Sequence, residues 1–214
     1  MQDIAIYGAG GFGKEVACIL NKINEIQLTY NLVGFFDDGV HKGTDISHFG
    51  QVLGGLSELN SWETPISIVF AIGNPAIIET LVNNVTNHNV SYPNIIHPDV
   101  FFADPISLSM GIGNVIVRGC TFSVDVTIGN FNQMNSLSSL GHDVVMGSFN
   151  VLMPLTRVSG EVQIGSYNIF GLNTLILQQI KIGKNVRTGP GAVMMTKPRD
   201  GMLYMGNPAK KTIL

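Results

Sequence analysis

The chain has 214 residues, of which 45% are hydrophobic, and its formal net charge is -3. This length and hydrophobic content are sufficient for one large domain or two small ones with packed cores, which excludes a disordered chain. Only 13% of the residues are charged. No basic surface is therefore available to neutralise a phosphate backbone, and nucleic acid is not an expected partner.

The cysteines and the N-terminal residues indicate the compartment. Cys18 and Cys120 lie far apart and show none of the spacings of a zinc site, so we expect two buried thiols in a reducing cytosol and no metal. The first residues lack the basic region and cleavage site of a signal peptide, and no apolar run approaches the ~18 residues of a membrane span. We therefore expect a cytoplasmic protein without a membrane span.

The first part of the chain alternates between strand and helix patterns. Apolar runs predict strands at 4–8, 32–38 and 66–73. Helices are predicted at 12–24 and at 75–88, the second opened by an Asn-Pro pair. This alternation predicts an α/β domain with a parallel sheet.

A six-residue period replaces this pattern from about residue 106. Stepping in sixes from Met110 to Met194 gives fifteen positions, here called anchors, and all except Thr188 are apolar. Such a period is typical of a solenoid in which each unit is a short strand and a turn, with the anchor pointing inward. The alternative, a β-sandwich, would need an alternating pattern interrupted about every eight to twelve residues.

Two further positions of the repeat are distinctive. Small residues often stand two places before the anchor, where we expect them to share the interior. Glycine often follows the anchor, where we expect it to supply the permissive backbone angles of a turn. Prolines interrupt regular structure between 92 and 105, and we predict two domains, 1–92 and 93–214.

The chain also resembles one family of bacterial enzymes. The segments that carry the resemblance are IAIYGAGGFGKEV, GFFDD, FAIGN, NIIHP, NSLSSLGHDVVMG and GAVMMTKPRDGMLYMGNPAKK. That family joins a Rossmann-like N-terminal domain to a left-handed parallel β-helix, and it includes bacillosamine-pathway N-acetyltransferases and sialic acid O-acetyltransferases. The resemblance implies this fold, its handedness, a homotrimer, and transfer of acetyl from acetyl-CoA to a sugar.

His142 is the candidate catalytic base. Attack of an amine or hydroxyl on a thioester needs a proton acceptor, and imidazole titrates near neutral pH. The period places His142 on a turn, two residues beyond the anchor Leu140, where a histidine is accessible but often merely solvated. The resemblance gives it the proton-acceptor role, with Asp143 as the acidic neighbour that makes the imidazole more basic and Asn135 as a nearby polar residue. By spacing alone, Asp143 could equally be a solvated turn residue.

A G-x-G-x-x-G loop follows the first predicted strand, and an acidic pair follows the second. Backbone N–H groups at such a helix start attract phosphate, so the loop alone suggests an NAD-dependent oxidoreductase. Fewer than a hundred residues precede the repeats, which is too few for a complete dinucleotide enzyme. The resemblance instead implies a nucleotide-sugar site, although Phe12 stands where family members often carry histidine. The candidate residues are Gly10, Gly11, Phe12, Asp37, Asp38, Gly73 and Asn74.

The resemblance assigns the pantetheine arm of acetyl-CoA to Gly171, Leu172, Gly189 and Pro190, and we expect the glycines to let a thin ligand approach the backbone. We predict direct acetyl transfer to a sugar, in particular to the amino group of a nucleotide-activated amino sugar of surface-glycan synthesis. O-acetylation of a free sialic acid or capsular sugar is the alternative reaction. A non-catalytic nucleotide-binding trimeric scaffold is the alternative of another class.

Overall fold

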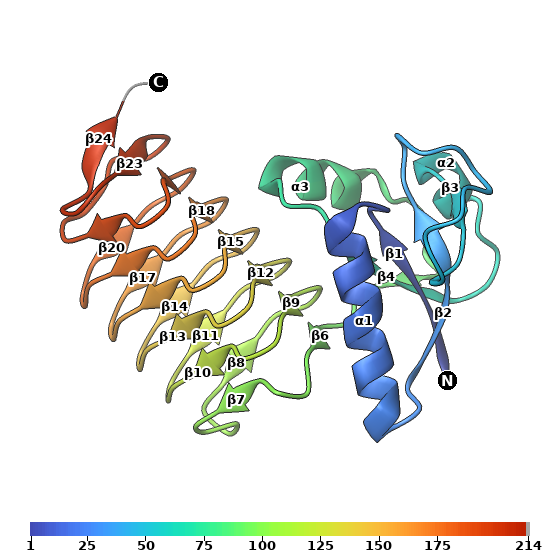
Figure 1. The fold of residues 1–214 in the computed structure, drawn as a ribbon, viewed down its shortest axis with the longest axis horizontal. Coiled ribbons are helices and arrows are strands. Elements are labelled where there is room, and N and C mark those ends of the chain that lie inside the picture. Colours follow the sequence, from blue (N-terminus) through green and yellow to red (C-terminus); the bar gives the residue numbers. More distant parts are fainter. Residues whose placement is uncertain (213–214) are drawn as a thin grey trace. The chain divides into compact units, whose positions relative to one another are not determined.

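The structure, a computed structural model, describes residues 1–212 and divides into two compact units, Met1–Pro98 and Asp99–Leu214 (Figure 1). The predicted boundary after residue 92 falls inside the first unit. It lies in the segment between β5 (Val90–Ser91) and β6 (Ile95–Ile96).

The first unit contains a five-stranded sheet with the strand order β3-β2-β1-β4-β5, in which all neighbours are parallel. β4 is buried along its whole length and β1 over its last four residues, as expected for the apolar central strands of a parallel sheet. The remaining bounds, in chain order, are β1 (Gln2–Tyr7), α1 (Gly11–Ile26), β2 (Tyr30–Phe36), β3 (Val52–Gly54), α2 (Leu56–Asn60), β4 (Ile66–Phe70) and α3 (Pro75–Asn84).

The predicted α/β architecture is confirmed, with some element ends displaced. α3 ends at Asn84 because the following segment is held as a loop. There the side-chain amide of Asn87 donates to the carbonyl oxygens of Leu59 and Trp62, at 2.8 and 2.7 Å. The sequence pattern does not predict β3, α2 or β5, because each has five residues or fewer and shows no periodicity.

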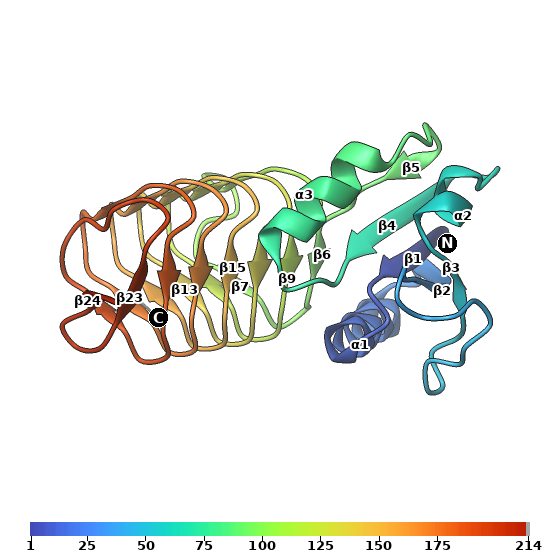
Figure 2. The same ribbon diagram turned by 90° about the horizontal axis from the view of Figure 1, so that it is seen from above.

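The second unit is a β-helix whose coils follow one another along one axis (Figure 2). Strands 18 residues apart pair in parallel, as Thr121 does with Ser139, so three six-residue units make one coil. The first face consists of β7 (Phe101–Phe102), β10 (Thr121–Phe122), β13 (Ser139–Leu140), β16 (Arg157–Val158), β19 (Leu175–Ile176) and β22 (Val193–Met194).

The other two faces complete the coils. The second face consists of β8 (Ser109–Met110), β11 (Thr127–Ile128), β14 (Val145–Met146), β17 (Gln163–Ile164) and β20 (Lys181–Ile182). The third face in this unit consists of β9 (Val115–Ile116), β12 (Gln133–Met134), β15 (Val151–Leu152), β18 (Ile169–Phe170), β21 (Arg187–Thr188), β23 (Leu203–Met205) and β24 (Lys210–Thr212). Among the strands described for residues 99–212, β24 is the one that pairs antiparallel with its neighbour.

The anchors form the core of the β-helix, as predicted from their period. Those from Ile116 to Met194 are all buried, Thr188 included, whereas Met110 is half-buried. The residues two places earlier are buried as well, and Ser138, Thr156 and Thr174 are fully inaccessible. Burial of this double column is the main source of stability, because hydrophobic stabilisation scales with the apolar area removed from water.

The role predicted for the glycines after the anchors is wrong. The left-handed backbone conformation occurs two residues further on, at non-glycine positions such as Asp125 (φ 56°) and Phe131 (φ 53°). The glycines instead allow close stacking of coils. A Cβ on Gly147 would lie 2.8 Å from the carbonyl oxygen of Gly165 in the next coil, well inside van der Waals contact.

A column of buried asparagines connects the coils at the turn between the second and third faces. In Asn132, both the backbone N–H and the side-chain amide donate to Oδ1 of Asn114, at 2.9 and 3.0 Å. Asn150 and Asn168 repeat the arrangement, and Oδ1 of Asn168 finally accepts from the backbone N–H of Val186 at 2.8 Å. The side chains therefore satisfy backbone donors that would otherwise be buried without partners.

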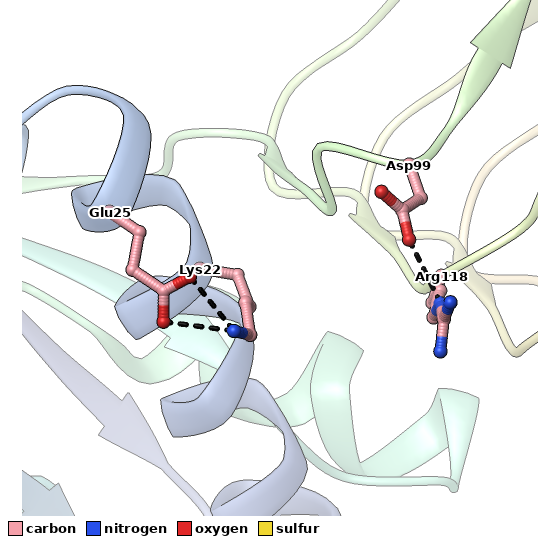
Figure 3. Close-up of polar contacts among 4 residues, drawn as sticks. All are labelled: Lys22, Glu25, Asp99 and Arg118. Carbon is pink, nitrogen blue, oxygen red and sulfur yellow. Dashed lines mark hydrogen bonds and ion pairs between the residues drawn. The ribbon is translucent and has the colours of Figure 1, made fainter.

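Ion pairs contribute little to either unit. Lys22 pairs with Glu25 on α1 at 2.8 Å, and Arg118 pairs with Asp99 in the second unit at 2.9 Å (Figure 3). All four side chains are at least half exposed. Exposed pairs of this kind typically contribute only about 0–1 kcal/mol.

The two thiols have different surroundings. Cys18 is exposed on α1, so the prediction that both cysteines are buried is wrong for it. It occupies an outward position of an amphipathic helix. Cys120 is buried, and burial raises the pKa of its thiol to about 11.

Residues 1–212 contain neither a candidate membrane span nor a candidate metal centre. No helix there combines the length and the apolar composition that a membrane crossing needs. In the same part of the chain, no three His, Cys, Asp or Glu side chains are arranged to hold a metal ion.

Candidate functional site

His142 and Asp143 form a close pair at the turn between the first and second faces, here called the His142 corner. Nδ1 of His142 lies 2.8 Å from Oδ2 of Asp143. The left-handed backbone of Asp143 (φ 58°) belongs to the repeated turn geometry, and Asp tolerates this conformation better than most residues. The side chains are 54% and 56% exposed, so the imidazole can meet a ligand from solvent.

Gly160 lies beside the other side of the imidazole and was not a sequence-derived candidate. It stands 18 residues after His142, hence directly above it in the next coil. A Cβ at Gly160 would lie 2.5 Å from Cε1 of His142 and would also collide with Nε2. The absence of a side chain at this position therefore makes room for the imidazole in its present position. The signal in the sequence is a glycine at a turn position that holds valine, histidine or glutamine in other coils.

An imidazole held in this way can act as a proton acceptor. If Nδ1–H donates to the Asp143 carboxylate, Nε2 carries the lone pair. The carboxylate then stabilises the imidazolium that forms when Nε2 takes a proton. This arrangement is the one that general base catalysis requires.

Asn135 lies at a different turn, the one between the third and first faces, here called the Asn135 corner. Its side-chain amide donates to the carbonyl oxygen of Leu152 at 2.9 Å, so the group also ties two coils together. Gly171 and Leu172 occupy the same corner two coils later, and Gly189 and Pro190 follow one coil beyond. The candidate acetyl-CoA residues and Asn135 thus form one column.

The two corners flank the first face. β13 begins four residues after Asn135 and ends two residues before His142, so these residues sit at opposite ends of one strand. Within one chain, the structure gathers Asn135 with the candidate acetyl-CoA residues and separates this group from His142.

The glycines of the Asn135 corner have a packing role. A Cβ on Gly171 would lie 2.6 Å from the carbonyl oxygen of Thr188, and one on Gly189 would lie 2.9 Å from Cγ of Met205. The close stacking of neighbouring coils therefore requires glycine at positions 171 and 189 whether or not a ligand binds. Leu172 is 46% exposed, so its side chain remains available at the surface.

The candidate nucleotide-sugar residues converge at one edge of the first unit's sheet. Gly10, Asp37 and Gly73 follow the carboxyl ends of β1, β2 and β4, which are adjacent in the sheet. The chain order reverses between β1 and β4, and the crevice at such a point is the usual ligand site of open α/β sheets. Gly11 opens α1, Phe12 is half-buried in its first turn, and Asn74 caps α3 by accepting from the backbone N–H of Ala76 at 3.0 Å.

The first glycines of the loop have distinct roles. Gly8 has a left-handed φ of 115°, and its missing Cβ leaves room for the carbonyl oxygen of Ala71. Gly10, Gly11 and Gly73 have no atom within 4 Å of the place where a Cβ would stand. Open space beside backbone at the start of a helix is suitable for an anionic group.

Asp37 and Asp38 hold the loops around this edge. Asp37 accepts from the backbone N–H groups of Ala9 and Gly39, each at 2.8 Å. Asp38 accepts from the Tyr7 hydroxyl at 2.6 Å and from the backbone N–H of Leu56 at 2.9 Å. Burial raises the pKa of Tyr7 well above its ordinary value, and the bond to Asp38 raises it further. Both carboxylates therefore order the protein and remain acceptors for a ligand with their further lone pairs.

Comparisons with known proteins add family information to this geometry. Residues 3–85 match the family described as the PglD N-terminal domain. No curated protein matches the chain in sequence.

Several solved structures are similar to nearly the whole chain. The acetyltransferase domain of PglB from Neisseria gonorrhoeae FA1090, in complex with acetyl coenzyme A, is 30% identical, with a TM-score of 0.88 and coverage of 99% of each chain. WeeI from Acinetobacter baumannii AYE is 26% identical, with a TM-score of 0.88, and 99% of this chain and 100% of that chain are covered. PerB from Caulobacter crescentus, in complex with CoA and GDP-perosamine, is 24% identical, with a TM-score of 0.87. The match covers 99% of this chain and 98% of that chain and shows that the two proteins share a fold.

Proposed function

Because this chain belongs to the sugar acetyltransferase family that joins a Rossmann-like domain to a left-handed β-helix, we propose that it acetylates a nucleotide-activated amino sugar with acetyl-CoA. The observation that carries the proposal is the exposed His142–Asp143 pair, whose imidazole occupies the space that the missing side chain of Gly160 leaves. The relatives bound to acetyl-CoA or CoA support the choice of acyl donor.

The proposed reaction is a direct transfer. The sugar amine attacks the carbonyl carbon of the thioester, Nε2 of His142 accepts the proton that the amine loses, and the carbon–sulfur bond breaks. CoA leaves as a thiolate and is then protonated. Asp143 holds the ring through Nδ1, and no serine or cysteine is needed as an acyl carrier.

The first unit is proposed to bind the nucleotide part of the acceptor. The helix N-terminus at Gly11 and the open backbone at Gly10 and Gly73 supply N–H groups for phosphate, and Asp37 or Asp38 supplies an acceptor for ribose or base. At position 12, phenylalanine offers the ligand an apolar surface without a hydrogen bond. The GDP-perosamine bound by PerB is consistent with a nucleotide-sugar acceptor.

A homotrimer would unite the two corners that one chain keeps apart. Exposed apolar side chains stand along both corners: Leu137, Met153 and Leu172 on the Asn135 corner, and Leu177 and Met195 on the His142 corner. A head-to-tail contact between different surfaces closes into a ring under threefold symmetry. In that ring, His142 of one chain would face Gly171 and Gly189 of the next. Sedimentation of a fully active monomer would contradict this assembly.

The test of the function is release of free CoA from acetyl-CoA across a panel of nucleotide-amino sugars and free sugars. His142→Ala should lower kcat by roughly 10² to 10⁴, the usual value of a general base, and leave thermal unfolding nearly unchanged. His88→Ala, which removes an exposed histidine from the first unit, is the control. Wild-type turnover in a folded His142→Ala protein would exclude His142 as the base. Activity confined to free sialic acid or capsular sugars would favour O-acetylation.

A further inference from the structure

The single polar anchor of the β-helix, Thr188, is part of a closed ring of hydrogen bonds. Its hydroxyl oxygen accepts from the backbone N–H of Gly171 at 2.9 Å and lies 2.7 Å from the hydroxyl of Thr174. Thr174 in turn donates to the carbonyl oxygen of Gly171 at 2.7 Å. Each hydroxyl has one hydrogen, so the Thr188 hydroxyl donates to Thr174, and the three residues satisfy one another.

The ring is inside the β-helix, where water does not compete with it. Thr174 is fully inaccessible and Thr188 is 6% exposed. Every other anchor is apolar, and an apolar residue at this position would bury the same area without needing any hydrogen-bond partner. Core burial therefore does not explain the threonine. What the hydroxyl adds is a second fixed partner for the Gly171 peptide, beyond the backbone bond from Gly171 to Thr188 at 3.2 Å.

The residue that the ring fixes is at the surface where acetyl-CoA is proposed to bind. Gly171 precedes the exposed Leu172, and one coil later Gly189 immediately follows Thr188. The two hydroxyls hold the N–H and the C=O of Gly171, which belong to the peptide groups on either side of its Cα, so the orientation of both peptide groups is set from within the core. A ligand that lies along the corner meets a surface that is already ordered, which reduces the entropy lost on binding.

We propose that Thr188 and Thr174 are positioning residues for the acyl donor, acting through the backbone of Gly171 without touching the ligand. This inference rests on the proposed function. It predicts that the hydroxyl of Thr188 is needed for the affinity for acetyl-CoA and not for the chemical step.

The experiment compares Thr188→Val, which keeps the shape and removes the hydroxyl, with Thr188→Ser, which keeps the hydroxyl. Thr188→Val should raise the dissociation constant of CoA and the KM for acetyl-CoA by about 3- to 30-fold, the range expected from a lost buried hydrogen bond. The kcat and the KM for the sugar should stay within about twofold, and Thr188→Ser should restore most of the affinity. Thr174→Val breaks the ring from its other side and should have the same effect, which keeps the test possible if Thr188→Val does not fold.

The control is Ser138→Ala. Ser138 is the fully buried counterpart of Thr174 two coils earlier, and its hydroxyl donates to the carbonyl oxygen of Met153 at 3.3 Å, away from Gly171. It should lose stability comparably and keep wild-type affinity for CoA. Folded Thr188→Val protein with a wild-type CoA dissociation constant would overturn the inference. The inference would also be overturned if Ser138→Ala weakened CoA binding as much as Thr188→Val does, because the effect would then not be specific to Gly171. A wild-type protein that binds no CoA would instead overturn the proposed function, and the positioning role with it.

Discussion

Substitution of Gly160 by alanine tests whether the position of the His142 imidazole against Gly160 matters for catalysis. The added Cβ would lie 2.5 Å from Cε1 and 2.9 Å from Cδ2 of the imidazole. Carbon atoms in contact are about 3.5 to 4.0 Å apart, so the ring must move by roughly 1 Å or more. A displacement of this size from a reactive geometry costs about 10²-fold in rate. We expect kcat to fall by about that factor while both KM values change little.

The fold should tolerate the same change. Gly160 does not have a left-handed φ, so alanine fits its backbone, and removing a glycine restricts the unfolded chain by about 0.4 to 1 kcal/mol. The imidazole that must move is half exposed and ends a flexible side chain, so its displacement costs little. The midpoint of thermal unfolding should therefore remain close to that of the wild type.

The assay is CoA release under saturating substrates, with Gln178→Ala as control, because Gln178 occupies the equivalent exposed turn position one coil beyond Gly160. A second measurement places Gly160→Ala in the His142→Ala background. If Gly160 acts through the imidazole, the double variant should be no slower than His142→Ala alone. Undiminished turnover in folded Gly160→Ala protein, or a full additional loss in the double variant, would refute the reasoning.

Two other predictions concern the β-helix. Asn150→Ala removes the acceptor of the Asn168 backbone N–H, whereas Asn132 Oδ1 keeps the backbone N–H of residue 150 as a donor. Leaving the Asn168 N–H buried and unpaired should lower the free energy of unfolding by about 1 to 3 kcal/mol; equilibrium denaturation would measure it, and an unchanged free energy of unfolding would contradict the role of the column. Cys120 should not react with a thiol reagent in the native protein at pH 8. Its thiol is buried, and a pKa of about 11 leaves roughly one thiol in a thousand as the reactive thiolate. The reagent should therefore modify one cysteine per chain, the exposed Cys18, before denaturation and both cysteines after it. Modification of both cysteines in the native protein would show that the core at Cys120 opens readily.

The period of the anchors predicts the β-helix because each anchor solves the same local problem, burial of one side chain per short strand. That repetition makes the signal strong even though each strand has two residues. Short elements outside the repeat, such as α2, depend on contacts distant in sequence. The Leu56 N–H that helps to start α2 binds Asp38, 18 residues earlier, and no local pattern encodes that pairing.

The candidate site is predictable in part for the same reason. The position of His142 on a turn follows from the period, whereas its contact with Asp143 depends on the left-handed backbone at 143, which carries no glycine signal. Gly160 acts across a coil boundary and becomes visible only when residues 18 apart are superposed. The exceptional threonine at 188 is visible in the sequence, but its partner Gly171 is not.

The direction of β24 bears on how the molecule avoids unwanted association. The last coil of a parallel solenoid exposes strand edges whose direction and spacing suit the first coil of another molecule, which favours growth into filaments. On the third face, β24 pairs antiparallel with β23 and covers that edge. Its exposed Lys210 and Lys211 add charge at the new border. An incoming chain would meet reversed strand polarity and two positive side chains, so this face terminates the stack instead of extending it.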